Sequence, residues 1–192
     1  MPPKKNYSKK DILNAGMEIV REAGFSFISA RNIAKKISSS QIPIYSNYSS
    51  IDEVKIEVRN SFRDLMYKFM ENDYTENKVL NAAIGVCIFA REEKKAFEEL
   101  FFTDENIKEN IKEFVGEVYK KFEKEDRFKR VTPEALNELL IDMWIYTHGL
   151  AVIINRNLIE NISDEEITKR IFKVSQIIIK EKYKGENDGQ EI

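Results

Sequence analysis

Apolar residues recur at intervals of three and four along most of this chain, the spacing that places side chains on one face of an α-helix. The first such stripe consists of Ile12, Ala15, Ile19 and Ala23. Ser8 and Asp11 precede it in the pattern of a capping box, and Gly24 follows it where a helix end favours glycine. We therefore predict a helix over residues 8–23.

The stretch 29–48 predicts two short helices across a tight turn. Ser29 can cap the first helix, which reaches about Ile37, and Ser40 can cap the second. Two helices this short, joined by about three residues, match a helix-turn-helix. In that motif the second helix enters the major groove of DNA and the first crosses the phosphates.

The remaining sequence predicts more helices and no strand. Capping patterns open three of them, at Ser50, at Thr132 followed by Pro133, and at Ser163. The apolar spacing places these further helices at about 50–71, 75–92, 94–102, 105–124, 132–159 and 163–183. With only 7 Gly and 4 Pro in 192 residues, we expect an all-α protein.

Composition narrows the class of protein. Apolar residues make up 42% of the chain and charged residues 33%, which is typical of a globular domain. A single Cys forms no intrachain disulfide and suits a reducing compartment. Residues 1–10 are polar and basic, and no apolar run approaches the ~20 residues of a membrane span. We therefore expect a cytoplasmic protein with no membrane partner.

Charge is distributed unevenly along the chain, although the net charge is only −2. Residues 1–50 hold eight Lys and Arg against three Asp and Glu, a net of +5. Residues 51–192 hold 23 against 30, a net of −7. A basic N-terminal region in an otherwise acidic chain indicates that this region binds phosphates. The alternative is a solvated N-terminal helix without a partner.

The motif Ser29-x-Arg31-x-Ile33-Ala34, followed by Ser40-x-x-x-Ile44-Tyr45-x-x-Tyr48, resembles the DNA-binding motif of the TetR/AcrR repressors. Gly24 before it and Asp52-Glu53-Val54 after it fit that pattern. The resemblance implies an N-terminal three-helix DNA-binding domain over 1–50 and a C-terminal helical bundle over 51–192 for ligand binding and dimerisation. Ser38, Tyr48 and Ile51 depart from the family pattern, which usually has Gly, Phe and Lys there.

The resemblance also implies which residues contact DNA. They are Ser29, Arg31, Lys35, Ser39, Ser40, Gln41, Ile42, Pro43, Tyr45 and Ser46, with Lys55 in place of the missing lysine. Gln41 is the best base reader by its chemistry, because its amide can bond adenine in two places. Ile42 and Pro43 offer apolar surface to a thymine methyl group.

The last two predicted helices are apolar on more than one side, which would leave apolar surface exposed in a monomer. A two-fold homodimer that pairs both helices of each subunit would cover it. We expect this interface to include Leu139, Met143, Thr147, Leu150, Ile154, Ile167, Ile171, Val174 and Ile178. A dimer also pairs two recognition helices, so the operator should be roughly palindromic. Gly149 suggests a close helix–helix approach.

Candidate chemistry is sparse. His148 is the only histidine, and Cys87 lies in an apolar helix where it is expected to be an inert core residue; a redox-sensor role is the alternative. No phosphate loop or metal motif occurs, so we expect no enzyme, no cofactor and no metal. An apolar effector could bind among Phe62, Phe89, Phe97, Phe101, Phe114, Trp144 and His148. Ordinary core packing is the alternative for each of these residues.

The resemblance, together with the charge distribution, implies a ligand-responsive DNA-binding transcription regulator, expected to be a repressor, that binds a palindromic double-stranded operator as a homodimer. A small and largely apolar effector would shift it between two states. The alternative is a helical interaction or small-molecule-binding protein that has lost DNA binding, to which Ser38 and Ile51 give weight.

Overall fold

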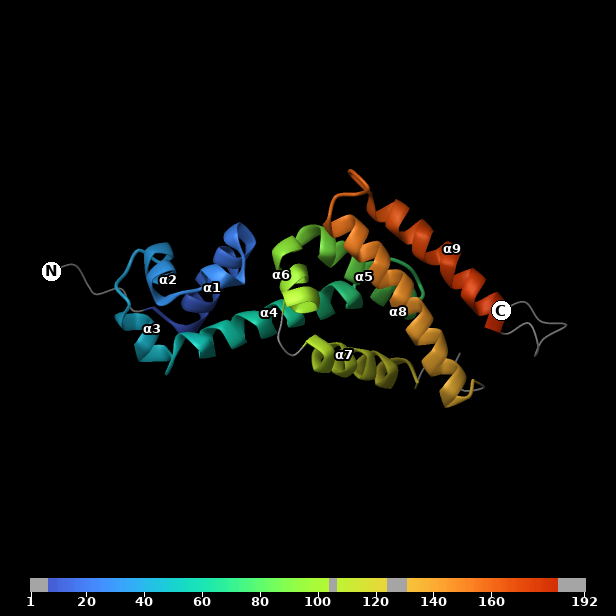
Figure 1. The fold of residues 1–192 in the computed structure, drawn as a ribbon, viewed down its shortest axis with the longest axis horizontal. Helices are drawn as coiled ribbons and strands as arrows, with labels where there is room; N and C mark the ends of the chain where they lie inside the picture. The colour runs from blue at the N-terminus through green and yellow to red at the C-terminus, as the bar shows by residue number, and fades with distance from the viewer. Residues whose placement is uncertain (1–6, 104–106, 124–130, 183–192) are drawn as a thin grey trace. The chain divides into compact units, whose positions relative to one another are not determined.

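The computed structural model describes residues 7–103, 107–123 and 131–182, and within these ranges every regular element is helical (Figure 1). The all-α prediction is confirmed for this part of the chain. The elements are α1 (Lys9–Ala23), η1 (Phe25–Phe27), α2 (Ala30–Lys36), α3 (Ile42–Asn47), α4 (Ile51–Glu71), α5 (Lys78–Glu92), α6 (Lys94–Glu98), η2 (Glu99–Thr103), α7 (Ile107–Phe122), α8 (Pro133–Asn155) and α9 (Asp164–Lys182). None of these helices is both long and apolar enough to span a membrane.

The chain folds into two compact units. The first, which we call the head, comprises residues 1–65 and 93–104; the second, the body, comprises 66–92 and 105–192. The α4 helix therefore contributes residues to both units, up to Leu65 in the head and from Met66 in the body. The head extends beyond residue 50, at which we expected the DNA-binding domain to end.

The head is held by a small apolar core. Ser8 and Asp11 form the expected capping box at the start of α1, and both of its hydrogen bonds are present. Side chains from α1, α2, α3 and α4 are fully buried together, namely Ile12, Val20, Ile33, Ile44, Val58 and Phe62. A Cβ added at Gly16 would lie 2.6 Å from Cγ2 of Val58, so α1 and α4 approach closely there.

The segment α6–η2 also belongs to the head, which the sequence patterns did not predict. Arg21 of α1 pairs with Glu93 at 2.7 Å, and Arg59 of α4 pairs with Glu99 at 2.7 Å. Each of these pairs joins residues 40 or more positions apart. Helical periodicity carries no information about such distant partners. The sequence therefore predicted a helix at 94–102 but not whether it belongs to the head or to the body.

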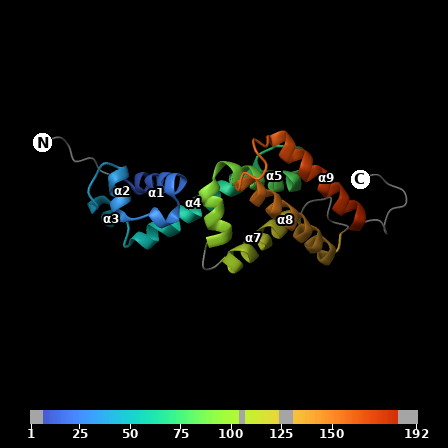
Figure 2. The same cartoon turned by 45° about the horizontal axis from the view of Figure 1, so that its top comes forward.

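The body is built around α5, which packs against α8 and α9 (Figure 2). Ten of its fifteen residues are buried, as expected for a helix that is apolar on most sides. A Cβ at Gly85 would collide with the backbone of Phe69, so the end of α4 lies directly against α5. Glycine is required at this position because the two backbones touch.

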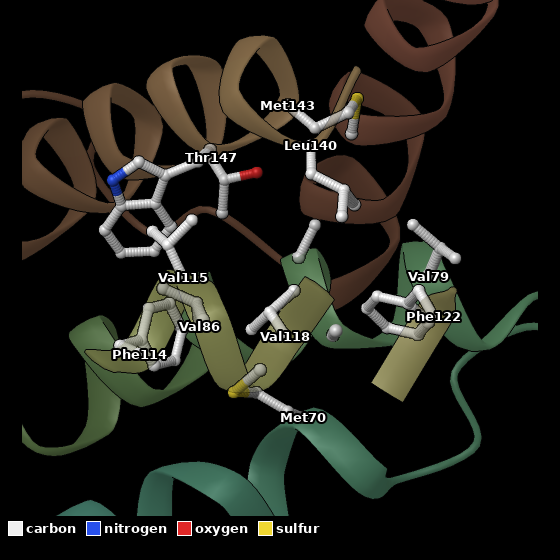
Figure 3. A pocket seen from close by; sticks show the side chains of 13 residues that line it. Met70, Val79, Val86, Phe114, Val115, Val118, Phe122, Leu140, Met143 and Thr147 are labelled. Atoms are coloured by element: carbon white, nitrogen blue, oxygen red, sulfur yellow. The ribbon is translucent and has the colours of Figure 1, made fainter. Parts of the chain in front are cut away.

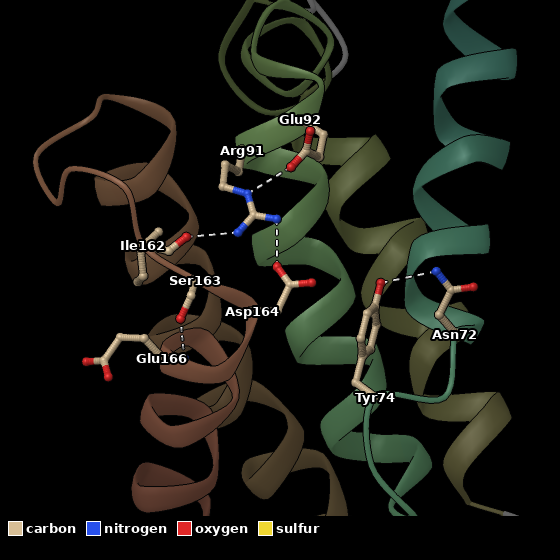
Figure 4. A network of polar contacts seen from close by, with 8 residues as sticks. All are labelled: Asn72, Tyr74, Arg91, Glu92, Ile162, Ser163, Asp164 and Glu166. Atoms are coloured by element: carbon tan, nitrogen blue, oxygen red, sulfur yellow. Dashed lines mark hydrogen bonds and ion pairs between the residues drawn. The ribbon is translucent and has the colours of Figure 1, made fainter.

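A polar network ties the end of α5 to the start of α9 (Figure 4). The Arg91 guanidinium donates to the carbonyl of Ile162 at 2.9 Å and to the Asp164 carboxylate at 2.6 Å. The Ser163 hydroxyl accepts from the backbone N–H of Glu166 at 3.2 Å and caps α9 as predicted. Arg91 thus joins the end of α5 to the residues that begin α9.

Gly149 is not a point of close helix packing within the chain. A Cβ added there meets no atom within 4 Å, so no described helix approaches it closely. The close approach in the body occurs at Gly85 instead.

This difference gives a matched pair of substitutions. Gly85→Ala should lower the free energy of unfolding by about 1–3 kcal/mol, because α4 and α5 must separate. Gly149→Ala should leave it unchanged or raise it by up to ~1 kcal/mol, because alanine favours helix and the site is open. Denaturant unfolding of both variants at one protein concentration measures the difference, and equal stabilities would contradict the packing at Gly85.

Candidate functional site

Two short helices, α2 and α3, form the surface on which most of the expected DNA contacts lie. The Ser29 hydroxyl accepts from the backbone N–H of Asn32 at 3.2 Å and caps α2 as predicted. The cap of α3 differs from the prediction, because the helix starts after Gln41 and no side chain caps it. Ser40 accepts only a long bond of 3.4 Å from the N–H of Ile42.

Burial divides α3 into an inner and an outer face. Ile44 is fully buried, and Tyr48 directly after the helix is also buried. Ile42 is 66% exposed and Tyr45 is 54% exposed. Ser40, Gln41 and Ser46 are exposed as well, whereas Ser39 and Pro43 are half-buried. The outer face therefore presents an amide, an isoleucine, a phenol and hydroxyls to the surroundings.

The cations of the head differ in whether an acid lies beside them. Ion pairs join Lys9 with Glu53 and Glu57, Arg21 with Glu93, Lys36 with Glu18 and Glu22, Lys55 with Asp52, Arg59 with Glu99, and Lys95 with Glu98. Arg31 and Lys35 are exposed on α2 and pair with no acid in the described part of the chain. Positive charge is therefore left uncompensated beside α3. Lys55, an expected phosphate contact, instead lies 3.0 Å from Asp52.

Two further residues hold this surface in place, and the sequence patterns did not reveal them. The Tyr7 hydroxyl donates to the carbonyl of Ile37 at 2.6 Å, at the turn between α2 and α3. The Asn47 amide donates to the carbonyl of Tyr7 at 3.1 Å. Tyr7, which precedes α1, is thereby fastened to the turn after α2 and to α3.

Tyr48 carries a hydroxyl where the resembled family usually has Phe, and the structure gives this hydroxyl a partner. It donates to the Glu57 carboxylate of α4 at 2.7 Å. Burial, together with this bond and the charge of Glu57, raises the pKa of Tyr48. The phenol is therefore neutral, and it links the end of α3 to α4.

Ser38, in the turn, departs from the family pattern and adopts a left-handed conformation with φ of 53°. Side chains with a Cβ are disfavoured in this region, which glycine enters without strain. Its N–H donates to the carbonyl of Lys35 at 3.1 Å, so the turn keeps its hydrogen bond despite the serine.

Ser38→Gly should raise the free energy of unfolding by about 1 kcal/mol, because it removes the Cβ strain of the turn. Asn161 provides the control, since it also has a left-handed φ, of 51°. Asparagine tolerates this conformation better than serine, so Asn161→Gly should give a smaller gain. Thermal unfolding of both variants tests the difference, and destabilisation by Ser38→Gly would contradict it.

The body contains an apolar cavity of about 50 Å³ (Figure 3). Its walls come from the end of α4, from α5, from α7 and from α8. The lining residues are Met70, Val79, Ala82, Ala83, Val86, Phe114, Val115, Val118, Phe122, Leu140, Met143, Trp144 and Thr147. Phe114 and Trp144, two of the residues expected in a pocket, are among them.

The other expected pocket residues lie elsewhere. Phe62, Phe97 and Phe101 are buried in the head. Phe89 packs against Phe69 with ring centroids 5.9 Å apart. His148 packs against the Trp144 ring at 5.1 Å and does not line the cavity. Burial lowers the pKa of His148, which favours its neutral form.

The residues expected at the dimer interface are mostly core residues. Seven of them are buried within the subunit, namely Leu139, Met143, Thr147, Leu150, Ile154, Ile167 and Ile171. Val174 and Ile178 are half-buried. The exposed apolar side chains of α8 and α9 are Ile141, Ile145, Ile153, Phe172 and Ile177. The periodicity identified apolar helices, but it did not say which apolar face packs inside the subunit.

Cys87 has the surroundings of an inert thiol. It is fully buried in α5, and burial raises its pKa to about 12. Its Sγ lies 3.7 Å from the carbonyl of Thr147. A thiol that remains protonated reacts slowly. In the described ranges, no group of three His, Cys, Asp or Glu residues is placed to hold a metal ion.

Comparison with known proteins adds no relative, since neither a protein-family model nor a curated protein matches the chain in sequence. The features that bear on function are the α2–α3 surface and the cavity of the body.

Proposed function

We propose that this chain is a DNA-binding transcription repressor of the TetR/AcrR kind, which acts as a homodimer and responds to a small molecule. The observation that carries the proposal is the charge pattern of the head. Six cations of the head are paired with acids, whereas Arg31 and Lys35 on α2 pair with no acid among the described residues. Exposed cations next to an exposed helix suit the phosphates that flank a DNA groove.

In this proposal α2 and α3 form a helix-turn-helix, and α3 enters the major groove. The Gln41 amide bonds an adenine edge, and Ile42 contacts a thymine methyl group. Arg31, Lys35 and the Tyr45 hydroxyl bind phosphates. The large exposed area of Ile42 favours this role, because an isoleucine that is 66% exposed leaves most of its apolar surface available to a partner.

The homodimer forms through an apolar stripe on α8. Ile141, Ile145, Gly149 and Ile153 follow one another at four-residue intervals, so they share one face of the helix. All four are exposed in the subunit. The missing side chain at Gly149 lets a helix of a second copy approach closely, and the flanking isoleucines are then buried. The exposed Phe172 and Ile177 of α9 extend the interface.

The response to a ligand follows from the two parts of α4. Met70 of this helix lines the body cavity, and Val58 and Phe62 of the same helix lie in the core of the head. A ligand that displaces Met70 therefore acts on an element that the head also needs. The mechanism is a shift between two populated states, one of which binds the operator better.

A second candidate is a helical small-molecule-binding protein that has lost DNA binding. The pairing of Lys55 with Asp52 favours it, because Ile51 already replaces the lysine usual in the family and its substitute is partly neutralised. The salt dependence of duplex binding separates the two candidates.

We expect the protein to bind duplex DNA with an affinity that falls steeply with salt. Arg31→Ala should reduce the slope of log Kd against log salt by about 1, because one phosphate contact is lost. Lys36→Ala is the matched control on the same helix; its ammonium already pairs with Glu18 and Glu22, so the slope should hardly change. Fluorescence anisotropy with a random-sequence duplex measures both, and equal effects would contradict the proposed phosphate-binding role of Arg31.

The dimer interface is tested by a charge placed in the α8 stripe. Ile145→Glu should convert the dimer to a monomer, because it would bury an unpaired carboxylate between the subunits. Ile56→Glu is the control, since Ile56 is an exposed isoleucine of the head outside the stripe. Analytical ultracentrifugation gives the masses; a dimer that survives Ile145→Glu would refute this interface.

A further inference from the structure

The Thr147 hydroxyl is a buried polar group without a partner. Thr147 is 3% exposed on α8, and its Oγ1 forms no hydrogen bond with any described residue. A threonine in a helix can bond the carbonyl one turn earlier, but this bond is not made here. Unpaired buried hydroxyls are uncommon because they cost free energy, so each one calls for an explanation.

The surroundings of Thr147 indicate what kind of group could pair with its hydroxyl. Thr147 lines the body cavity on the α8 wall with Leu140 and Met143, opposite residues of α5 and α7 (Figure 3). Of the thirteen lining residues, only Thr147 and Trp144 carry a side-chain nitrogen or oxygen. An ordered water needs two to four polar partners, and these two side chains alone offer it too few. The oxygen of a ligand, in contrast, needs only one hydrogen-bond donor.

We propose that the Thr147 hydroxyl donates a hydrogen bond to an uncharged oxygen of the effector, at an end of the molecule that is otherwise apolar. This inference rests on the proposed response to a small molecule and specifies its chemical class. The end of the effector that enters this cavity is not charged, because no lining residue bears a charge that could compensate it. Ketones, esters and amides fit this description, whereas carboxylates and amines do not.

The volume of the cavity shows that the effector must also occupy space outside it. About 50 Å³ is too small for a whole ligand of ordinary size. A second cavity of about 310 Å³ shares Met70, Ala82, Val118 and Phe122 with the first. Met70 is flexible and adaptable, so a movement of its side chain joins the two spaces. The second cavity combines apolar walls with polar residues such as Asp73 and Asn81, and it accepts the part of the effector that the first cavity cannot hold.

Trp144 lines the inner cavity and is the only tryptophan of the chain, so its fluorescence reports occupancy directly. The probes are 2-heptanone, heptane and heptanoate, which share a chain length and differ in the polar group. The whole 192-residue chain should bind 2-heptanone about tenfold more tightly than heptane, the factor that one hydrogen bond of about 1.4 kcal/mol provides. Heptanoate should bind most weakly.

Two variants assign this preference to the hydroxyl. Thr147→Val replaces it by a methyl group of the same shape, so 2-heptanone and heptane should bind equally. Thr147→Ser keeps the hydroxyl and should keep the preference. Thr147→Val should also melt no lower than the wild type, because it removes an unpaired buried group. The inference is overturned if the ketone preference survives Thr147→Val, or if none of the probes changes the emission of Trp144.

The titration needs no DNA, which keeps this inference separate from the proposed function. A protein that binds duplex DNA but keeps its ketone preference in Thr147→Val is a regulator with a different ligand site. A protein that shows the Thr147-dependent preference and binds no duplex has the ligand site without the DNA-binding function.

Discussion

The outward face of α3 depends on the burial of Ile44 and Tyr48 beneath it. A helix of six residues is too short to be stable alone, so its direction is set by packing and not by its own hydrogen bonds. Ile44 fills the core of the head, and the Tyr48 hydroxyl is held by Glu57. With these two residues fixed inside, Gln41 and Ile42 have no place within the subunit and remain available to a partner. The proposed recognition of DNA follows from this constraint.

The distribution of charge in the head also supports the proposed recognition of DNA. Pairs such as Arg21 with Glu93 and Arg59 with Glu99 are partly buried and hold α6–η2 to the head. In such a pair the carboxylate neutralises the cation, which is then less available to bind a DNA phosphate. Arg31 and Lys35 are not used in this way. The net charge of the chain, −2, hides this arrangement, because it adds together cations that are paired with acids and cations that are not.

Local features were predictable from the sequence, and tertiary ones were not. The caps at Ser8, Ser29 and Ser163 are confirmed, since each depends on residues three positions apart. The placement of α6–η2 was missed because it depends on ion pairs between distant residues. For the same reason, the apolar spacing of α8 could not separate Thr147, on the cavity wall, from Ile145, on the surface. Two aromatic residues of the cavity, Phe114 and Trp144, were predicted only through their residue types.

The most direct test of DNA recognition by α3 is to ask which duplexes the purified 192-residue chain selects from a random pool at low salt. We expect an enriched site with two inverted half-sites about one helical turn apart, ~34–36 Å, and adenine or thymine at the positions read by Gln41 and Ile42. A pool that stays unenriched, with no duplex retained even at low ionic strength, would contradict it.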